Sequence, residues 1–195
     1  MALDLTDDNK LWLYTANELS NRSKGTAVIR RYNAMTGQQS WALELGVAKN
    51  KKKTSWTVGV KASPVIGRNQ LDDLVYFTAA GLTAAGANEL GLGSKAVDAA
   101  LLAIHKDTGK LAWAYALPSY TESSPVAVYS EAGKGWIIQC CADGTILMLD
   151  GLTGKLINQI KVTGSISASP AVFGSTMVIA TSGTKATSFI YGITL

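Results

Sequence analysis

Two short markers recur along the chain at the same interval. Ser-Pro pairs begin at Ser124 and Ser169, and Thr-Gly pairs begin at Thr108 and Thr153, so that both intervals are 45 residues. Because two independent markers share one spacing, the spacing indicates a structural repeat. A period near 45 residues is typical of the blade of a β-propeller. The full set of markers is Ser63-Pro64, Ser124-Pro125, Ser169-Pro170, Thr36-Gly37, Thr108-Gly109 and Thr153-Gly154.

The segments between the markers favour strands over helices. They are short and rich in Val, Ile, Thr and aromatic residues, and none carries a sustained apolar stripe with a 3.6-residue period. We therefore predict an all-β fold, a partial β-propeller of about four four-stranded antiparallel blades. The blades are expected at about 1–46, 55–118, 119–163 and 164–195, and the strands of the third at 122–128, 135–142, 145–150 and 155–162.

The glycines and prolines of the markers fit that arrangement. Gly37, Gly109 and Gly154 are expected in hairpin turns, where glycine adopts the positive φ that β-branched residues resist. A proline cannot donate a ladder hydrogen bond, so it is tolerated at the start of a strand or at a sheet edge. We accordingly expect the first strand of a blade to begin beside each of Pro64, Pro125 and Pro170.

Two tryptophans occupy one position of the repeat. Trp41 stands four residues after Gly37, and Trp113 stands four residues after Gly109. A tryptophan at a fixed repeat position is expected to pack between neighbouring blades, with its indole N–H on a backbone carbonyl. Replacing either residue by Ala is then predicted to cost about 3 to 5 kcal/mol.

The two ends of the chain both fall inside a predicted blade. Ala2 to Leu5 reads as the tail of a first strand, followed by strands at 11–18, 27–34 and 40–46, and residues 187–194 read as a third strand. An unpaired strand edge invites pairing with another chain. We expect that the chain is a C-terminal fragment, that Leu195 lies near a natural terminus, and that a distant N-terminal segment supplies the missing outer strand. In isolation the fragment should pair its edges or form a homodimer.

Charge and hydropathy restrict the partners. The formal charge is +4, and much of it comes from Lys49, Lys51, Lys52 and Lys53, a run that is expected to be a solvated loop. No aromatic residues interleave with basic ones in the way that binding of single-stranded nucleic acid requires. No apolar stretch reaches 18 residues, so we predict no membrane span. A nucleic-acid partner is likewise not expected.

Three segments carry a family resemblance. YNAMTGQQSW (32–41) and HKDTGKLAW (105–113) resemble the tryptophan-docking motif of the pyrroloquinoline-quinone (PQQ) type propeller repeat, Ala-x-Asp-x-x-Thr-Gly-x-x-x-Trp. DGLTGKLIN (150–158) matches up to its last position, where Asn158 replaces Trp. This family includes PQQ-dependent alcohol dehydrogenases and cofactor-free relatives, among them a lipoprotein scaffold of the bacterial outer-membrane β-barrel assembly machinery. The resemblance implies a bacterial protein outside the cytoplasm, either secreted, periplasmic or on the cell surface.

His105 and the cysteine pair are the candidates for chemistry. His105 is the only histidine, but it takes the repeat position of Asn33 and Asp150, so we expect it to hydrogen-bond the turn. Cys140 and Cys141 align with small residues in the sister strands, which favours two buried free thiols. The alternative comes from the resemblance, because PQQ alcohol dehydrogenases possess a vicinal disulfide beside the cofactor.

A quinone site would need calcium held by carboxylate and amide oxygens, a catalytic Asp and an aromatic floor. None of the acids has a recognisable ligand spacing, and Asp72-Asp73 is most simply a turn. We therefore expect no catalytic residue, no metal site and no cofactor, with PQQ and calcium as the alternative. The scattered acids are Asp72, Asp73, Glu89, Asp98 and Glu122.

One segment departs from the repeat. Residues 80–100 expand the link between the second and third strands of blade 2 to about twenty residues, where the sister links have a few. The segment is either a binding loop or a mobile loop without function, and its small apolar residues could form a short helix. We predict a non-catalytic scaffold that binds a protein or polysaccharide; the alternative is a piece of a PQQ- and calcium-dependent dehydrogenase. The candidate binding residues are Asn88, Glu89, Lys95 and Asp98.

Overall fold

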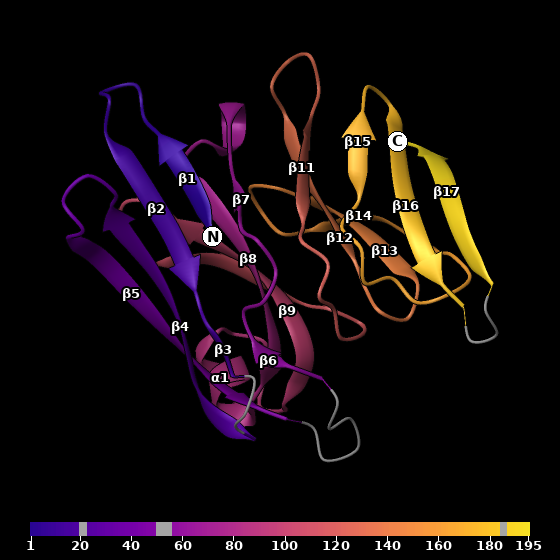
Figure 1. Cartoon of the computed structure of the whole chain (residues 1–195), viewed down its shortest axis with the longest axis horizontal. Helices are drawn as coiled ribbons and strands as arrows, with labels where there is room; N and C mark the ends of the chain where they lie inside the picture. The colour runs from indigo at the N-terminus through magenta and orange to yellow at the C-terminus, as the bar shows by residue number, and fades with distance from the viewer. Residues whose placement is uncertain (20–22, 50–55, 184–186) are drawn as a thin grey trace.

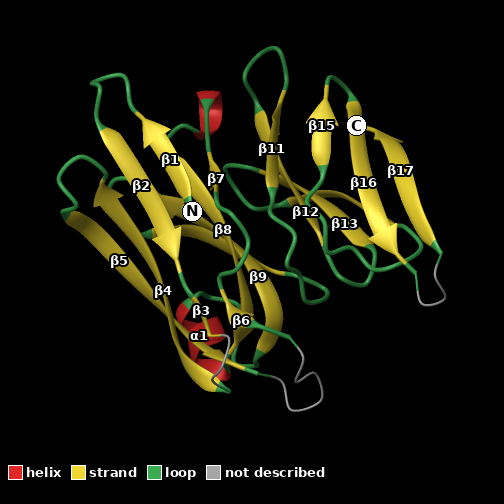
Figure 2. Ribbon diagram, viewed as in Figure 1, coloured by secondary structure: helices red, strands yellow, loops and turns green. Residues whose placement is uncertain are grey.

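The computed structural model describes residues 1–19, 23–49, 56–183 and 187–195, and in these ranges almost every regular element is a β-strand (Figure 2). The strands form antiparallel sheets that follow one another along the chain as the blades of a partial propeller. The all-β prediction and the prediction of about four antiparallel blades are confirmed. Lys51, Lys52 and Lys53 of the predicted solvated loop lie outside the described residues.

Blade 1 has four strands in the order of the sequence. Their pairing is β1-β2-β4-β5, and each pair is antiparallel. The second strand ends earlier than expected because Asn17 leaves the ladder: its side-chain Oδ1 accepts from the Val28 N–H at 2.9 Å, and its carbonyl accepts from the Val60 N–H at 3.1 Å. The strands are β1 (Ala2–Leu5), β2 (Leu11–Ala16), β4 (Lys24–Asn33) and β5 (Gln39–Ala48).

In blade 2 the second and third strands are long. β8 (Leu74–Leu82) and β9 (Val97–His105) pair from Leu74↔His105 to Leu82↔Val97, with the short β7 (Val65–Ile66) and β10 (Leu111–Ala116) on either side. The link between β8 and β9 is therefore shorter than the predicted 80–100 expansion, because both strands extend into that segment. It contains α1 (Ala84–Glu89), which is the predicted short helix.

Blades 3 and 4 follow the repeat with fewer additions. In blade 3 the first strand begins after Pro125 rather than at Glu122, because the Ser123 N–H bonds Thr121 Oγ1 and the Ser124 N–H bonds Ser169 Oγ instead of a ladder carbonyl. Blade 4 has three strands in the described chain. The strands of blade 3 are β11 (Val126–Tyr129), β12 (Gly135–Cys140), β13 (Thr145–Asp150) and β14 (Leu156–Lys161), and those of blade 4 are β15 (Ala171–Phe173), β16 (Thr176–Ser182) and β17 (Ser188–Thr194).

Figure 1 shows blade 1 in indigo at one end of the molecule and blade 4 in yellow at the other. Alternate residues of each strand point to opposite faces, so each inner blade buries apolar side chains against both neighbours. Three apolar clusters result, one at each junction between successive blades. At the first junction β3 (Glu18–Leu19), β6 (Val58–Gly59) and β8 also join the sheets of blades 1 and 2.

The Ser-Pro markers link one blade to the next. The Ser63 N–H donates to Ser124 Oγ at 3.0 Å, and the Ser124 N–H donates to Ser169 Oγ at 2.9 Å. The proline after each serine is buried and stands directly before the first strand of its blade. The serine therefore satisfies a backbone N–H of the preceding blade, which explains why both residues of the marker recur.

The tryptophans of the repeat lie at the first two junctions. Trp41 is 8% exposed and its Nε1–H donates to the Lys106 carbonyl at 2.7 Å, whereas Trp113 is 9% exposed and its Nε1–H donates to the Gly151 carbonyl at 2.9 Å. Each acceptor belongs to the following blade and stands three residues before its turn glycine. Both tryptophans therefore tie one blade to the next in the same geometry.

Candidate functional site

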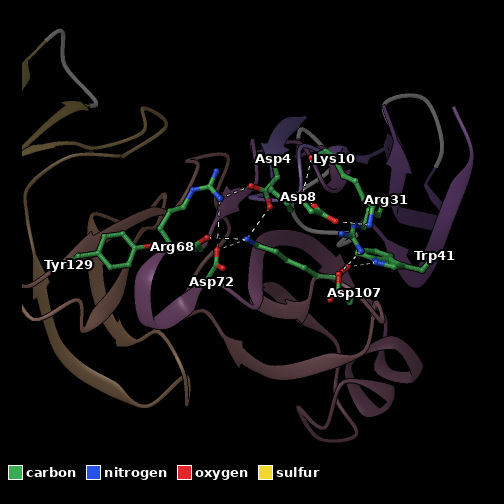
Figure 3. A network of polar contacts seen from close by, with 12 residues as sticks. Asp4, Asp8, Lys10, Arg31, Trp41, Arg68, Asp72, Asp107 and Tyr129 are labelled. Atoms are coloured by element: carbon green, nitrogen blue, oxygen red, sulfur yellow. Dashed lines mark hydrogen bonds and ion pairs between the residues drawn. The ribbon is translucent and has the colours of Figure 1, made fainter. Parts of the chain in front are cut away.

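A polar pocket lies at the junction of blades 1 and 2, where strand ends and turns of both blades meet. Figure 3 shows the network of ion pairs and hydrogen bonds at this junction. The volume of the pocket is about 290 Å³. Three cationic and four anionic side chains line it, and several of them form ion pairs with one another. The lining residues are Leu5, Thr6, Asp7, Arg31, Arg68, Asp72, Asp73, Lys106 and Asp107.

Asp4 is the buried centre of this network. Its side chain has no exposed surface; Arg68 Nη1 lies 2.6 Å from its Oδ1 and Lys106 Nζ lies 3.0 Å from its Oδ2. Burial acts to raise the pKa of Asp4, but the hydrogen bonds and charges of Lys106 and Arg68 outweigh it and hold that pKa below its ordinary value. Asp4 is therefore an ionised carboxylate that joins the first strand of blade 1 to blade 2.

Lys106 is held at this junction by several partners. Its Nζ donates to the Gly67 carbonyl at 3.2 Å and lies 3.3 Å from Asp72 Oδ1, and its side chain is 8% exposed. The carbonyl of the same residue accepts the Trp41 indole N–H. One residue after β9 thus contributes both its side chain and its backbone to the contact with blade 1.

Arg31 closes the outer side of the pocket. Its guanidinium carbon lies 3.7 Å from the centre of the Trp12 ring, and its Nη1 lies 2.9 Å from Asp107 Oδ1. The Arg31 side chain is 5% exposed, whereas Asp107 is 81% exposed. Because the cations are already paired with carboxylates, the pocket has the character of a structural ion network.

Sequence reasoning did not find Asp4, Arg31, Arg68 or Lys106. Each is an ordinary charged residue in the sequence, and the partners of Asp4 stand in another blade. A weak signal existed for Lys106 and Arg31: Lys106 directly follows the apolar run 99–104 and His105, and Arg31 stands two residues before Asn33, the residue that bonds the turn after β4.

His105 does not hydrogen-bond its turn as predicted. The sister residues do so: Asn33 Oδ1 accepts from the Thr36 N–H at 3.0 Å, and Asp150 Oδ1 accepts from the Thr153 N–H at 3.0 Å. His105 Nδ1 instead lies 2.5 Å from Asp73 Oδ2, because the turn after η1 (Asn69–Leu71) brings that carboxylate to it. Asp72 and Asp73 form the predicted turn.

Glu122 belongs to a separate cluster near the link between blades 2 and 3. Lys61 Nζ and the Tyr120 hydroxyl each lie 2.8 Å from Glu122 Oε1, and the Tyr120 ring stacks on Trp56 with centroids 4.2 Å apart. The hydrogen bond from Lys61 is the main reason that the pKa of Glu122 lies below its ordinary value. This carboxylate is already paired and does not meet Asp72 or Asp73.

Cys140 and Cys141 are buried free thiols at the end of β12. Burial raises the pKa of both thiols to about 12, so they remain protonated at neutral pH. Neither has the electropositive, accessible surroundings of a reactive cysteine.

The candidate acids lie in different parts of the fold. Asp72 and Asp73 are in a blade 2 turn, Glu122 is near Lys61, Glu89 ends α1, and Asp98 lies in β9. Within the described ranges, no three His, Cys, Asp or Glu side chains are grouped so that they could hold a metal ion.

The segment after β8 is a docked element rather than a loop detached from the propeller. Thr83 Oγ1 caps α1 by accepting from the Gly86 N–H at 3.1 Å, and the Thr83 N–H donates to the Gly46 carbonyl at 2.9 Å. A Cβ on Gly86 would meet that carbonyl at 2.6 Å, so glycine allows the close approach to β5. Asn88 and Glu89 are exposed on α1, and Lys95 is exposed in the bend that follows it. Asp98 is half-buried in β9.

Comparisons with known proteins support the fold. No protein-family model matches the chain, and no curated protein matches its sequence. BamB from Moraxella catarrhalis is similar in structure, with a TM-score of 0.55 and 18% identity over 98% of this chain and 45% of that one. This chain thus spans less than half the length of BamB.

Two further structures have a similar fold. The quinohemoprotein alcohol dehydrogenase ADHIIG from Pseudomonas putida HK5 gives a TM-score of 0.52 and 14% identity over 83% of this chain and 27% of that one. BBS1N, solved in complex with ARL6DN, gives 0.53 and 14% over 100% of this chain and 50% of that one. At these identities the likeness shows a PQQ-like propeller fold and no more.

Proposed function

We propose that this chain is part of a non-catalytic propeller scaffold that binds a protein partner. The observation that carries the proposal is the docking of α1 on β5, which presents Asn88 and Glu89 on a fixed base; Lys95 is exposed in the bend that follows the helix. A binding surface that is held in place before contact loses less conformational entropy on association. Loops on a rigid repeat scaffold are frequent binding surfaces.

The groups that could perform chemistry support the same proposal, because they are committed elsewhere. Asp72 pairs with Lys106, Asp73 with His105, and Glu122 with Lys61. One of the similar folds also favours it, because BBS1N was solved in complex with ARL6DN. A place outside the cytoplasm is part of the proposal and rests on the resemblance of the tryptophan-bearing segments to the PQQ-type repeat. The one α-helix that the structure describes has six residues and is too short to cross a bilayer.

Site-specific photo-crosslinking tests the scaffold proposal. A photoreactive residue at Asn88 is compared with one at Met35, which is 77% exposed in the turn between β4 and β5, at the opposite ends of the strands. We expect a crosslinked species of defined mass from Asn88 alone, in extract of cells that make the protein. Excess unmodified chain should abolish it, whereas excess Asn88→Arg chain should not. Equal crosslinking from both positions, or none from Asn88, would contradict the proposal.

The alternative is a piece of a PQQ- and calcium-dependent dehydrogenase, and the similarity to quinohemoprotein alcohol dehydrogenase keeps it testable. Calorimetric titration of PQQ and Ca²⁺ into the full-length protein separates the two functions. The scaffold proposal expects no saturable heat. Saturable binding of PQQ that depends on Ca²⁺ would favour the enzyme.

A further inference from the structure

The blades of this chain stack in one direction. Each blade has a preceding face and a following face, formed by alternate residues of its strands. At the third junction the following face of blade 3 contributes Ile138 and Ile146, and the preceding face of blade 4 contributes Met177 and Ile179. These side chains are nearly fully buried against one another, so each face is built to be covered by the next blade.

The following face of blade 4 carries apolar side chains that nothing in the described chain covers. Its residues alternate with the buried ones along β15, β16 and β17, as the register Ala171↔Val178↔Gly192 and Ala180↔Ile190 shows. Phe173 is 92% exposed, Ile190 79% and Val178 44%. By their place in the sheet, these residues correspond to the face of blade 3 that blade 4 buries.

The preceding face of blade 1 is also not covered by any of the described residues. Tyr14 and Ile29 point toward blade 2 and are fully buried, whereas the alternate residues form the opposite face. On that face Leu3, Leu13 and Tyr32 stand side by side across three strands. Leu3 is 58% exposed and Leu5 is 60% exposed. Val28 lies on the same face, and so do Arg30 and Glu44. The apolar part of this face is therefore the end formed by Leu3, Leu5, Leu13 and Tyr32, and that end is the part of blade 1 that another blade can cover.

We propose that two copies of this chain associate head to tail, so that blade 4 of each copy packs on blade 1 of the other. Within the described residues the chain has an uncovered following face on blade 4 and an uncovered preceding face on blade 1. A second copy can cover each of them with a face of the opposite kind. The new junction continues the existing stack of blade junctions. Blades 3 and 4 already pack without a docked tryptophan, because Asn158 stands in that position of blade 3. Blade 4 can therefore pack on blade 1 of another copy without a tryptophan on a fourth strand.

Closure of the ring explains why association stops at two copies. Two copies of four blades give about eight blades, which is within the range of closed propellers. A two-fold axis along the propeller axis makes both new junctions identical, and a closed ring leaves no apolar face for a third copy. The inference does not depend on the proposed function of the α1 segment, which lies away from both faces.

Single charges on the two faces test the proposal. Ile190→Glu places a charge on blade 4 and Leu3→Glu places one on blade 1; both side chains are more than half exposed, so the variants should fold as the parent does. Sedimentation equilibrium of the parent chain is expected to give the mass of a dimer. Each variant should raise the dimer dissociation constant at least tenfold. Met35→Glu and Leu152→Glu, in the hairpin turns before β5 and β14, are the matched controls and should remain dimeric.

Mixing separates this geometry from simple edge pairing. In an equimolar mixture of Ile190→Glu and Leu3→Glu, the intact blade 4 of one variant can pack on the intact blade 1 of the other, so heterodimer should reappear. The double variant should stay monomeric. A parent chain that is monomeric at all concentrations, a dimer that survives Leu3→Glu, or a mass that keeps rising with concentration would each overturn the proposal.

Discussion

Trp41 of blade 1 lies directly on Gly109 of blade 2: a Cβ built on Gly109 would meet the indole ring at 2.6 Å. Trp113 lies on Gly154 in the same way, also at 2.6 Å. In both cases the indole N–H reaches the carbonyl three residues before the glycine. The turn glycine of the repeat therefore has two tasks, which are to adopt a positive φ and to leave room for the tryptophan of the preceding blade.

Gly37 and Gly109 allow these two tasks to be separated. Their φ values are 72° and 69°, but nothing lies within 4 Å of a Cβ on Gly37. Gly37→Ala should cost only the backbone term of about 1 kcal/mol, whereas Gly109→Ala should cost about 2 to 4 kcal/mol because it also displaces the indole. Urea unfolding of both variants on the Ile190→Glu background measures the difference. Equal losses would show that the indole contact contributes nothing.

Truncation of Trp41 tests the contact from the other side. Trp41→Ala is expected to lower the free energy of unfolding by about 3 to 5 kcal/mol, since it removes a large buried ring from the first junction. Trp41→Phe keeps most of the apolar area but loses the bond to the Lys106 carbonyl, so a loss of about 1 to 2 kcal/mol is expected. Chemical denaturation checks both values. A Phe variant as unstable as the Ala variant would contradict this division.

The pairing of Asp4 with Lys106 predicts a dependence of stability on acid. Because the folded pKa of Asp4 is lowered, its contribution is complete above the unfolded pKa of about 3.9 and is lost as the pH falls through the folded value. Asp4→Asn should therefore be less stable than the parent at neutral pH, and the difference should shrink in acid. Thermal melts across this pH range measure it. A difference that does not change with pH would argue against an ionised Asp4.

Removal of the cation gives the complementary result. The Asp4 carboxylate is fully buried, and Lys106→Met removes one of its two cationic partners, so that only Arg68 remains. We expect a loss of about 2 to 4 kcal/mol at neutral pH. The double variant Asp4→Asn with Lys106→Met should recover part of that loss, because no buried charge then lacks its partner. Strict additivity of the two single losses would contradict the pairing.

The sequence predicted what depends on local pattern. The strand at Thr145–Asp150 and the junction positions of Trp41 and Trp113 follow from alternation and turn residues, which act over a few positions. Contacts between distant segments were not predictable in this way. Asp4 meets Arg68 and Lys106 only after the blades have stacked.

Two local expectations failed for identifiable reasons. The His105 side chain bonds Asp73 instead of its own turn, because Asp73, 32 residues earlier in the sequence, places a carboxylate within hydrogen-bonding distance. The ends of the long β8 and β9 were missed because alanine favours a helix and is depleted in strands. The pairing of the two strands along the whole hairpin outweighed that preference.

The thiols of Cys140 and Cys141 provide a test that also bears on the alternative function. Since burial raises the pKa of each to about 12, neither is a thiolate at pH 8, and neither is accessible. Native protein should react with iodoacetamide on the order of a hundredfold more slowly than protein unfolded in urea, because labelling requires local opening. Intact mass after timed labelling is the measurement, with Cys140→Ala and Cys141→Ala chains as controls for each site.

Two outcomes of that labelling would contradict buried free thiols. Rapid modification of either cysteine in the native protein would show that β12 opens at its end. Failure of the unfolded chain to take up label until it is reduced would show a disulfide between the adjacent residues. The second result would also favour the dehydrogenase alternative, because a vicinal disulfide is the feature through which this cysteine pair resembles the PQQ alcohol dehydrogenases. Two free thiols that label only on unfolding fit the positions that small residues occupy in the sister strands.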